Sequence, residues 1–317
     1  MNENIITKDL LNLILENQET PKTTESKEME LEQAISYFLA NQIKNSDDTL
    51  KYYKIEFNCL KTYFKMFDIR STKDLNNDFA LKLINTKKAE GVKNCTINKM
   101  LGTIKAMLNY LVKENLITES HITMQKLKYK EAKLIIPTPE EILRFKKYMD
   151  NQAPLEYRVM FYILIDTGLR RSSIANLLIT DINLDEQSII PSHTKENNEI
   201  KVYFGNKTKS LITEFIMLKK GLKSKFLFPS KSPQKPIEAT TITKIFIGIR
   251  NELGIPSISP HRLRHYFGTN LIRNNVNPEV VRKLLGHLSI YMTQRYINLN
   301  DNALKSASIN YSLADNL

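Results

Sequence analysis

Two stretches near the C-terminal end of the chain decide the fold: residues 260–265 (Pro-His-Arg-Leu-Arg-His) and residues 285–296 (Leu-Gly-His-Leu-Ser-Ile-Tyr-Met-Thr-Gln-Arg-Tyr). Proline suits the first turn of a helix, and a helical pattern runs from His261 to Asn274. Gly286 is typical of the residue that ends a helix, here one predicted over 278–285. The two stretches therefore place histidines and arginines on or just after two predicted helices, with Tyr296 nine residues beyond His287.

Two other segments upstream contribute basic side chains. Residues 167–170 (Thr-Gly-Leu-Arg) place Arg170 just after a glycine that ends a predicted helix. Strands are predicted over 188–190 and 200–204, and Lys195 lies in the turn between them, with Lys201 on the second strand as the alternative lysine. Arginine and lysine are side chains that bind phosphate oxygens. The four segments together indicate a site that acts on a phosphodiester.

A metal site is the competing interpretation of the two histidines at 261 and 265. Their spacing of four residues fits two zinc ligands on one helical face. However, Arg262 and Arg264 lie between them and no glutamate is present nearby to act as a base. The two cysteines of the chain cannot form a four-cysteine zinc site or a disulfide framework. We therefore expect no metal, and since no phosphate-binding glycine loop occurs, no nucleotide cofactor.

The ordered set of basic, histidine and tyrosine residues resembles the active site of the tyrosine recombinases, the integrase family of site-specific DNA recombinases. The residues that carry this resemblance are Arg170, Lys195, His261, Arg264, His287 and Tyr296. The segments around them match as well, over about 137–300, with one departure: Ser173 stands where the family usually has an acidic residue. The resemblance implies a mainly α fold with a small antiparallel β-sheet or hairpin in the catalytic domain, within a two-domain, C-shaped DNA clamp.

The same resemblance assigns a role to each residue. Arg170 and Arg264 would stabilise the pentavalent phosphorane, whose extra negative charge calls for fixed guanidinium donors. Tyr296 would be the nucleophile, with His261 accepting its proton. His287 would hydrogen-bond the scissile phosphate, and Lys195 would protonate the departing 5′ oxygen.

The expected reaction and partners follow from the family. A 3′-phosphotyrosyl intermediate and a Holliday junction would serve integration or excision of a mobile element, or the resolution of DNA molecules. The expected partner is double-stranded DNA with an inverted-repeat core site, bound by a homo-tetramer on two duplexes. Free in solution, the chain is expected to be a monomer or weak oligomer. The alternatives are a type IB topoisomerase-like relaxation enzyme and a catalytically inactive DNA-binding regulator.

Hydrophobic patterns and composition divide the chain into five segments. Residues 28–125 show helical apolar stripes and lack a motif for chemistry, which predicts a helical domain. The resemblance to the tyrosine recombinases implies that this is a SAM-like core-binding DNA-binding domain. The predicted segments are a flexible or short helical leader over 1–27, the core-binding domain over 28–125, a basic linker over 126–137, the catalytic domain over 138–300, and a tail over 301–317 that docks on a neighbouring subunit.

Composition and charge agree with this assignment. The chain has 317 residues and a net charge of +12, and residues 201–250 include eleven basic side chains and only two glutamates. Such a field attracts DNA or RNA. No apolar run approaches the eighteen residues of a membrane-spanning helix, so no membrane association is expected. With two cysteines and no secretory signal, the predicted location is the cytoplasm, associated with the nucleoid of a prokaryote-type cell.

Overall fold

The computed structural model describes residues 27–42, 47–130, 134–193, 200–219, 221 and 223–297. Three predictions therefore fall wholly or largely outside the described residues: the leader, the tail and Lys195. The chain divides into two compact units, Met1–Ala132 and Lys133–Leu317, which are described separately. Helices dominate both, and one small antiparallel sheet lies in the second, so the predicted mainly α fold class is confirmed.

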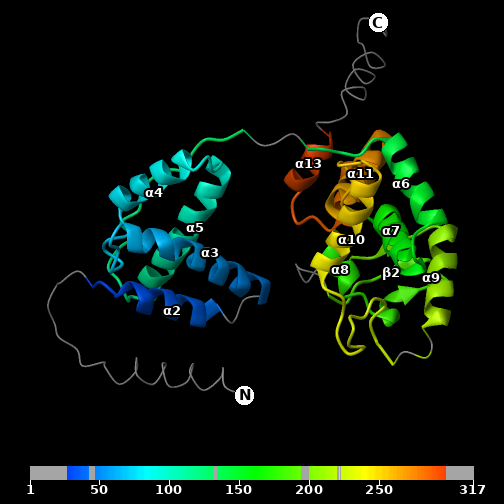
Figure 1. Ribbon diagram of the computed structural model, residues 1–317, viewed down its shortest axis with the longest axis horizontal. Helices are drawn as coiled ribbons and strands as arrows, with labels where there is room; N and C mark the ends of the chain where they lie inside the picture. The colour runs from blue at the N-terminus through cyan, green and yellow to red at the C-terminus, as the bar shows by residue number, and fades with distance from the viewer. Residues whose placement is uncertain are drawn as a thin grey trace, which may run out of the picture. The chain divides into compact units, whose positions relative to one another are not determined.

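The first unit is a bundle of helices around a shared apolar core (Figure 1). Its described helices are α2 (Leu31–Asn41), α3 (Asp47–Met66), α4 (Asn77–Ala89) and α5 (Asn94–Lys113). Helix α5 contacts each of the other three. The predicted stripe of α3 packs inward at Phe57, Leu60 and Phe64, all buried. Asn76 begins α4 by accepting hydrogen bonds from the backbone N–H groups of the first turn.

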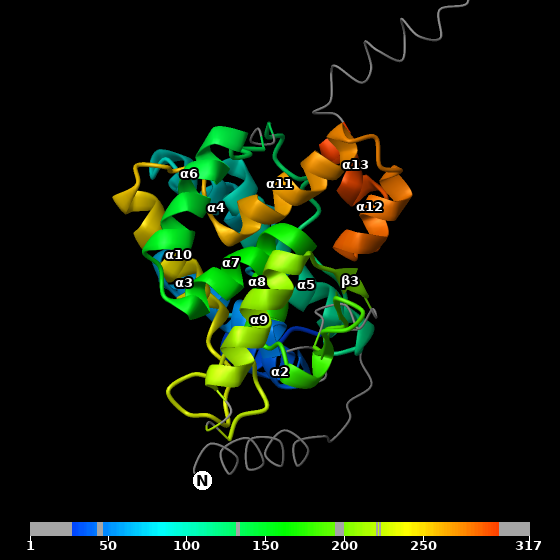
Figure 2. The ribbon, with the colours of Figure 1, turned by 90° about the vertical axis from the view of Figure 1, so that its right-hand side faces the viewer.

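The second unit is built around α7. The helices of this unit are α6 (Pro139–Asn151), α7 (Leu155–Thr167), α8 (Arg171–Ala175), α9 (Asn206–Leu218), α10 (Ala239–Glu252), α11 (Pro260–Arg273), α12 (Pro278–Leu285) and α13 (Tyr291–Ile297), with a 3-10 turn at Ile179–Asp181. Helix α7 is buried at six consecutive positions, residues 159–164, because α9 and α11 both pack against it (Figure 2). A helix that is apolar on every side is a core helix.

Local sequence signals determine where α6 begins. The Thr138 hydroxyl accepts a hydrogen bond from the backbone N–H of Glu141, and the Glu141 carboxylate accepts one from the backbone N–H of Thr138. Pro139 occupies the first helical position. Two otherwise unpaired backbone donors are thereby satisfied, which fixes where the second unit's first helix begins.

The sheet has three short strands, where the sequence predicted two. Strands β1 (Ile182–Asn183), β2 (Ser188–Ile189) and β3 (Val202–Tyr203) pair antiparallel in the order β1-β2-β3. Ile189 lies opposite Ile182 on one side and Val202 on the other. Strands β2 and β3 are the two predicted ones, and the connection between them contains Lys195.

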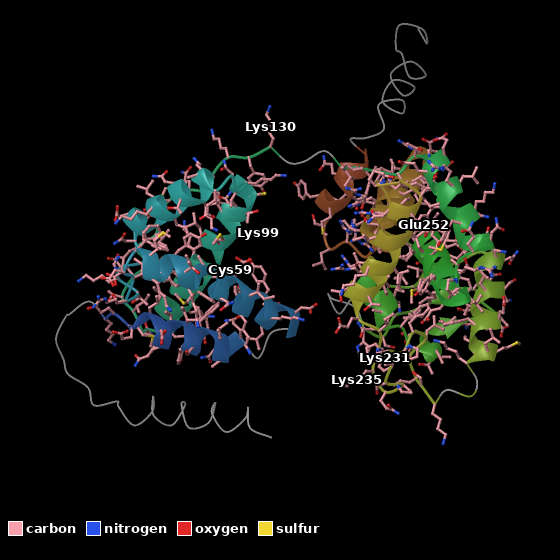
Figure 3. All side chains as sticks on the ribbon, in the orientation of Figure 1. Cys59, Lys99, Lys130, Lys231, Lys235 and Glu252 are labelled. Atoms are coloured by element: carbon pink, nitrogen blue, oxygen red, sulfur yellow. The ribbon has the colours of Figure 1, made fainter. Side chains whose placement is uncertain are left out.

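Much of the basic charge lies on exposed loops. Lys231 and Lys235 project outward from the loop ahead of α10, and Lys130 projects from the segment that follows α5 (Figure 3). Long basic side chains on a surface keep their charge in water, where it attracts polyanions. Within the described residues, no helix is both long and apolar enough to cross a membrane.

Candidate active site

Helix α11 carries the two histidines and the second arginine of the predicted site. Ser259 begins the helix by accepting a hydrogen bond from the backbone N–H of Arg262, and Pro260 follows at the first position. His261 is exposed, whereas Arg264 and His265 are 5% and 3% exposed. One helical turn separates the histidines, so their rings meet, with 2.9 Å between the two Nε2 atoms.

Tyr296 lies on α13 against this face of α11, buried with 1% exposure. Its hydroxyl is 2.8 Å from Nδ1 of His265. Gly268 makes room for the tyrosine ring, since a Cβ at that position would lie 3.2 Å from two ring carbons. The ring of His287 lies nearly parallel to that of Tyr296, at 9° and 6.2 Å between centroids. The predicted nucleophile is therefore held between two histidines.

Two helix C-termini hold the predicted catalytic arginines. Helices α7 and α12 each end at a glycine in the left-handed conformation, Gly168 (φ +62°) and Gly286 (φ +59°). Arg264 donates hydrogen bonds to the carbonyls of Gly168 (2.8 Å) and Leu285 (2.6 Å), and Arg170 donates to the carbonyl of Gly286 (3.3 Å). Helix C-termini carry unpaired carbonyls and partial negative charge, so cations are stabilised there.

His287 follows Gly286, and contacts at both its ring and its backbone carbonyl hold it in place. Its Nδ1 lies 3.0 Å from the Thr293 hydroxyl, and its backbone carbonyl accepts a 2.6 Å hydrogen bond from Arg282. Beside it lies a cavity of about 490 Å³ with a basic lining. The lining residues are Ile200, Lys201, Val280, Arg282, Lys283, Leu284, Gly286 and His287. Of the three basic side chains that line this surface, Lys201 is paired with Glu186 and Arg282 with Glu279.

Ile200, at the end of the β2–β3 connection, packs directly on the turn at Gly286. A Cβ at Gly286 would lie 1.9 Å from Cδ1 of Ile200, so only glycine permits the approach. Lys201, the alternative to Lys195, forms a 2.6 Å ion pair with Glu186. The hydrogen bond to the Glu186 carboxylate raises the pKa of Lys201, and the Lys201 ammonium in turn holds the pKa of Glu186 below its usual range. Lys201, the alternative to Lys195 as the catalytic lysine, is therefore paired with a carboxylate.

The structure brings five of the six predicted site residues into one network. The five are Arg170, His261, Arg264, His287 and Tyr296, and Lys195 lies outside the described residues. The contacts from His261 to the tyrosine run through His265, which the sequence had suggested only as a metal ligand. The signal that points to His265 is its i+4 position, which places it on the same helical face as His261. Ser173, at the family's acidic position, is buried.

No group of three histidine, cysteine, aspartate or glutamate side chains in the described part of the chain is arranged to bind a metal ion. The polar groups of the site are instead guanidinium, imidazole and phenol. Their chemistry is anion binding and proton transfer.

The chain is similar to proteins of a known family. Residues 137–303 match the model of the phage integrase family. The chain belongs to this family. The tyrosine recombinase XerD of Oceanobacillus iheyensis is 27% identical over 288 residues, which cover 87% of this chain and 95% of that protein. A tyrosine recombinase of Thermosipho africanus is 25% identical over 271 residues, which cover 84% of this chain and 94% of that protein.

Solved structures of integrases share the fold. The Tn1549 transposon integrase in complex with transposon right end DNA has a TM-score of 0.71 at 19% identity, over 84% of this chain and 94% of that one. A lambda integrase tetramer bound to a Holliday junction has a TM-score of 0.66 at 17% identity, over 93% and 87%. The resemblance to tyrosine recombinases, a family of enzymes that cleave and rejoin DNA, is therefore confirmed.

Proposed function

We propose that this integrase-family chain is a site-specific recombinase that cuts and rejoins DNA through a 3′-phosphotyrosyl intermediate and a Holliday junction. The observation that carries the proposal is the Tyr296 hydroxyl, 2.8 Å from a histidine, on a helix packed against the one that carries Arg264. The biological outcome would be integration or excision of a mobile element, or the resolution of DNA molecules.

The two arginines would act on the phosphate. In the phosphorane the non-bridging oxygens gain negative charge, and Arg170 and Arg264 would donate charge-assisted hydrogen bonds to them. Both guanidinium groups are already fixed by helix-terminal carbonyls, so little reorganisation accompanies the reaction. The loss of one preorganised donor of this kind costs about a hundred- to thousandfold in rate.

The remaining roles concern proton transfer and phosphate contact. Tyr296 would attack the phosphorus, with its proton passing to the histidines of α11. Lys195 would protonate the departing 5′ oxygen. His287, beside the basic cavity, would hydrogen-bond the phosphate. No cofactor is required in this scheme, because the phosphotyrosyl ester conserves the energy of the cleaved bond.

Assembly and domain roles extend the proposal. Residues 28–125 would bind the core site together with the catalytic domain over 138–300, connected by the basic linker over 126–137 in a C-shaped clamp. Four copies would act on two duplexes at an inverted repeat, and the tail over 301–317 would dock on a neighbouring subunit. The lambda integrase tetramer on a Holliday junction supports this assembly by analogy. The site of action would be nucleoid DNA in the cytoplasm.

The test compares the wild-type chain with Tyr296→Phe and with Tyr291→Phe as a matched control. Tyr291 lies on the same helix but is 79% exposed, so its hydroxyl is remote from the buried network. Each protein is incubated with nicked, fragmented source DNA and quenched in detergent, and the covalently attached DNA is then sequenced. We expect adducts from wild type and Tyr291→Phe, none from Tyr296→Phe, and convergence on one inverted repeat with 3′ linkage.

Other outcomes would contradict the proposal in distinct ways. Adducts that persist in Tyr296→Phe would identify a different nucleophile. Adducts without sequence preference would indicate relaxation activity of the topoisomerase type. No adduct from any of the three proteins, although all bind the DNA, would favour an inactive DNA-binding regulator.

A further inference from the structure

His265 occupies a position in the site that a packing role alone does not require. Its ring is 3% exposed, yet both of its nitrogens face polar atoms rather than apolar ones. Nδ1 lies 2.8 Å from the Tyr296 hydroxyl, and Nε2 lies 2.9 Å from Nε2 of His261. The chain of contacts thus runs from a buried phenol, through a buried imidazole, to an exposed imidazole.

The chemistry of imidazole restricts how protons are arranged along these contacts. A neutral imidazole has one N–H donor and one acceptor nitrogen. If the Tyr296 hydroxyl donates to Nδ1 of His265, the His265 proton is on Nε2 and is donated to His261. In the opposite arrangement, His261 donates to Nε2 of His265, whose Nδ1–H donates to the tyrosine oxygen. The two arrangements differ by one concerted proton shift, which is the requirement for a relay.

The surrounding charges determine which way such a relay is driven. In the described part of the chain, His265 contacts His261 on its own helix and Tyr296 of α13. Arg264 precedes it on α11, His287 stacks on Tyr296, and Arg170 bonds the Gly286 carbonyl beside His287. The guanidinium groups favour a phenolate on Tyr296 and oppose a lasting positive charge on the buried His265 ring. A proton delivered to exposed His261 is instead solvated by water.

We propose that His265 is a catalytic residue that relays the proton of Tyr296 to His261 and to solvent, an inference that rests on the proposed cleavage reaction. The tyrosine O–H bond breaks and Nδ1 of His265 gains that proton, while the Nε2 proton of His265 passes to Nε2 of His261. The phenolate oxygen then bonds to phosphorus as the bond to the 5′ oxygen breaks. His261 releases its Nδ1 proton to water, and the 5′ oxygen takes a proton from the general acid.

The same relay serves rejoining. After cleavage, His265 carries its proton on Nδ1 and His261 carries one on Nε2. When a 5′-hydroxyl attacks phosphorus, its proton returns to the group that acted as general acid, and the bond from phosphorus to the tyrosine oxygen breaks. The departing phenolate takes the Nδ1 proton of His265, His261 passes its Nε2 proton to Nε2 of His265, and His261 regains a proton on Nδ1 from water. Cleavage and rejoining thus run through the same two hydrogen bonds in opposite directions.

A first test requires no DNA and uses the full chain with ¹⁵N-labelled histidine. The chain has five histidines, and single substitutions assign their ring nitrogens by NMR. We expect His265 to be neutral at pH 7.5 with one dominant tautomer. Tyr296→Phe and His261→Asn should each shift both of its ring nitrogens, whereas His121→Asn should not. A doubly protonated His265, or one that neither substitution shifts, would overturn the proposal.

A second test measures single-turnover cleavage of the duplex that the wild-type adducts define. His265→Asn is the informative variant, because the asparagine amide reaches the position of Nδ1 and keeps a hydrogen bond to Tyr296 but cannot pass a proton on. We expect unchanged DNA binding and a cleavage rate about 10²- to 10⁴-fold lower at pH 7. That defect should shrink about tenfold per pH unit up to pH 9, because solvent base then removes the proton of a phenol that titrates near pH 10.

Coupling between the two histidines distinguishes a relay from simple positioning. In the double variant His261→Asn/His265→Asn, cleavage should be no more than about twofold slower than in the slower single variant, because both residues act in one step. Three results would each overturn the relay. They are a cleavage defect in His265→Asn that is equal at every pH, cleavage defects that multiply in the double variant, and the absence of any cleavage defect in His265→Asn. If one of these results is found while Tyr296→Phe still forms no adduct, the relay is wrong but the proposed recombinase function stands.

Discussion

Arg264 should stabilise the fold as well as the proposed transition state, and the substitution Arg264→Ala separates the two. The guanidinium is 5% exposed and bonds the terminal carbonyls of α7 and α12 at 2.8 and 2.6 Å. Hydrogen bonds to charged groups contribute about 1.5–3 kcal/mol each. Removal of a buried charge recovers part of its desolvation cost. We therefore expect a net loss near the lower bound for two bonds, about 3–4 kcal/mol.

The assay is thermal unfolding of the full chain, followed by calorimetry so that the two units are resolved. For a domain of this size, about 3–4 kcal/mol corresponds to a Tm decrease of roughly 6–16 °C in the transition of the second unit. Arg262→Ala is the matched control, because it lies on the same helix and its bond to the Pro256 carbonyl is exposed. That control should change Tm by no more than about 2–4 °C.

A Tm for Arg264→Ala within 2 °C of the Arg262→Ala value would refute the reasoning, because the two carbonyl bonds would then carry no net stability. If the expected decrease is found, cleavage by Arg264→Ala has to be measured well below its own transition. Only there does the remaining loss of rate report the missing contact with phosphate rather than unfolding.

Three further substitutions test other parts of the structure. Gly268→Ala should leave Tm nearly unchanged, because the gain in helix propensity offsets tight packing, yet slow cleavage about tenfold by displacing the Tyr296 ring a few tenths of an ångström. Burial raises the pKa of the Asp150 carboxyl, but its bonds to Lys146 and a tyrosine hydroxyl outweigh burial and lower it overall. Its contribution to stability is therefore present above about pH 4 and lost as pH falls through the folded pKa, so Asp150→Asn should cost roughly 0.5–1 kcal/mol at pH 7 and progressively less as the pH falls below about 4 in chemical denaturation. Thr138→Ala should remove the cap of α6 and lower the Tm of the second unit by about 2–4 °C in calorimetry.

The parts of the fold that the sequence predicts are those with local causes. The Thr138 cap, the glycine ends of α7 and α12 and the apolar stripe of α3 all depend on residues within one or two turns of each other. The elements that the sequence did not predict are short: α8, β1 and α13. Isolated segments of two to seven residues are unstable in water, so tertiary contacts determine whether they form.

The same distinction between local and tertiary causes applies to the candidate active site. The resemblance to the tyrosine recombinases indicated which residues belong together, but not the order of their contacts. The i, i+4 pair on α11 places His261 and His265 on one face, whereas the packing of α13 decides which of them Tyr296 meets. That packing depends on a glycine at 268, where any side chain would press on the tyrosine ring. No local pattern in the sequence encodes such a contact between separate helices.

The carbonyls at the two glycine caps help to hold the arginines in place and are compatible with phosphate binding. A helix-terminal carbonyl orients the guanidinium through a hydrogen bond while it carries only a partial negative charge. A guanidinium has five N–H donors, so bonds to one or two carbonyls are compatible with further bonds to phosphate oxygens.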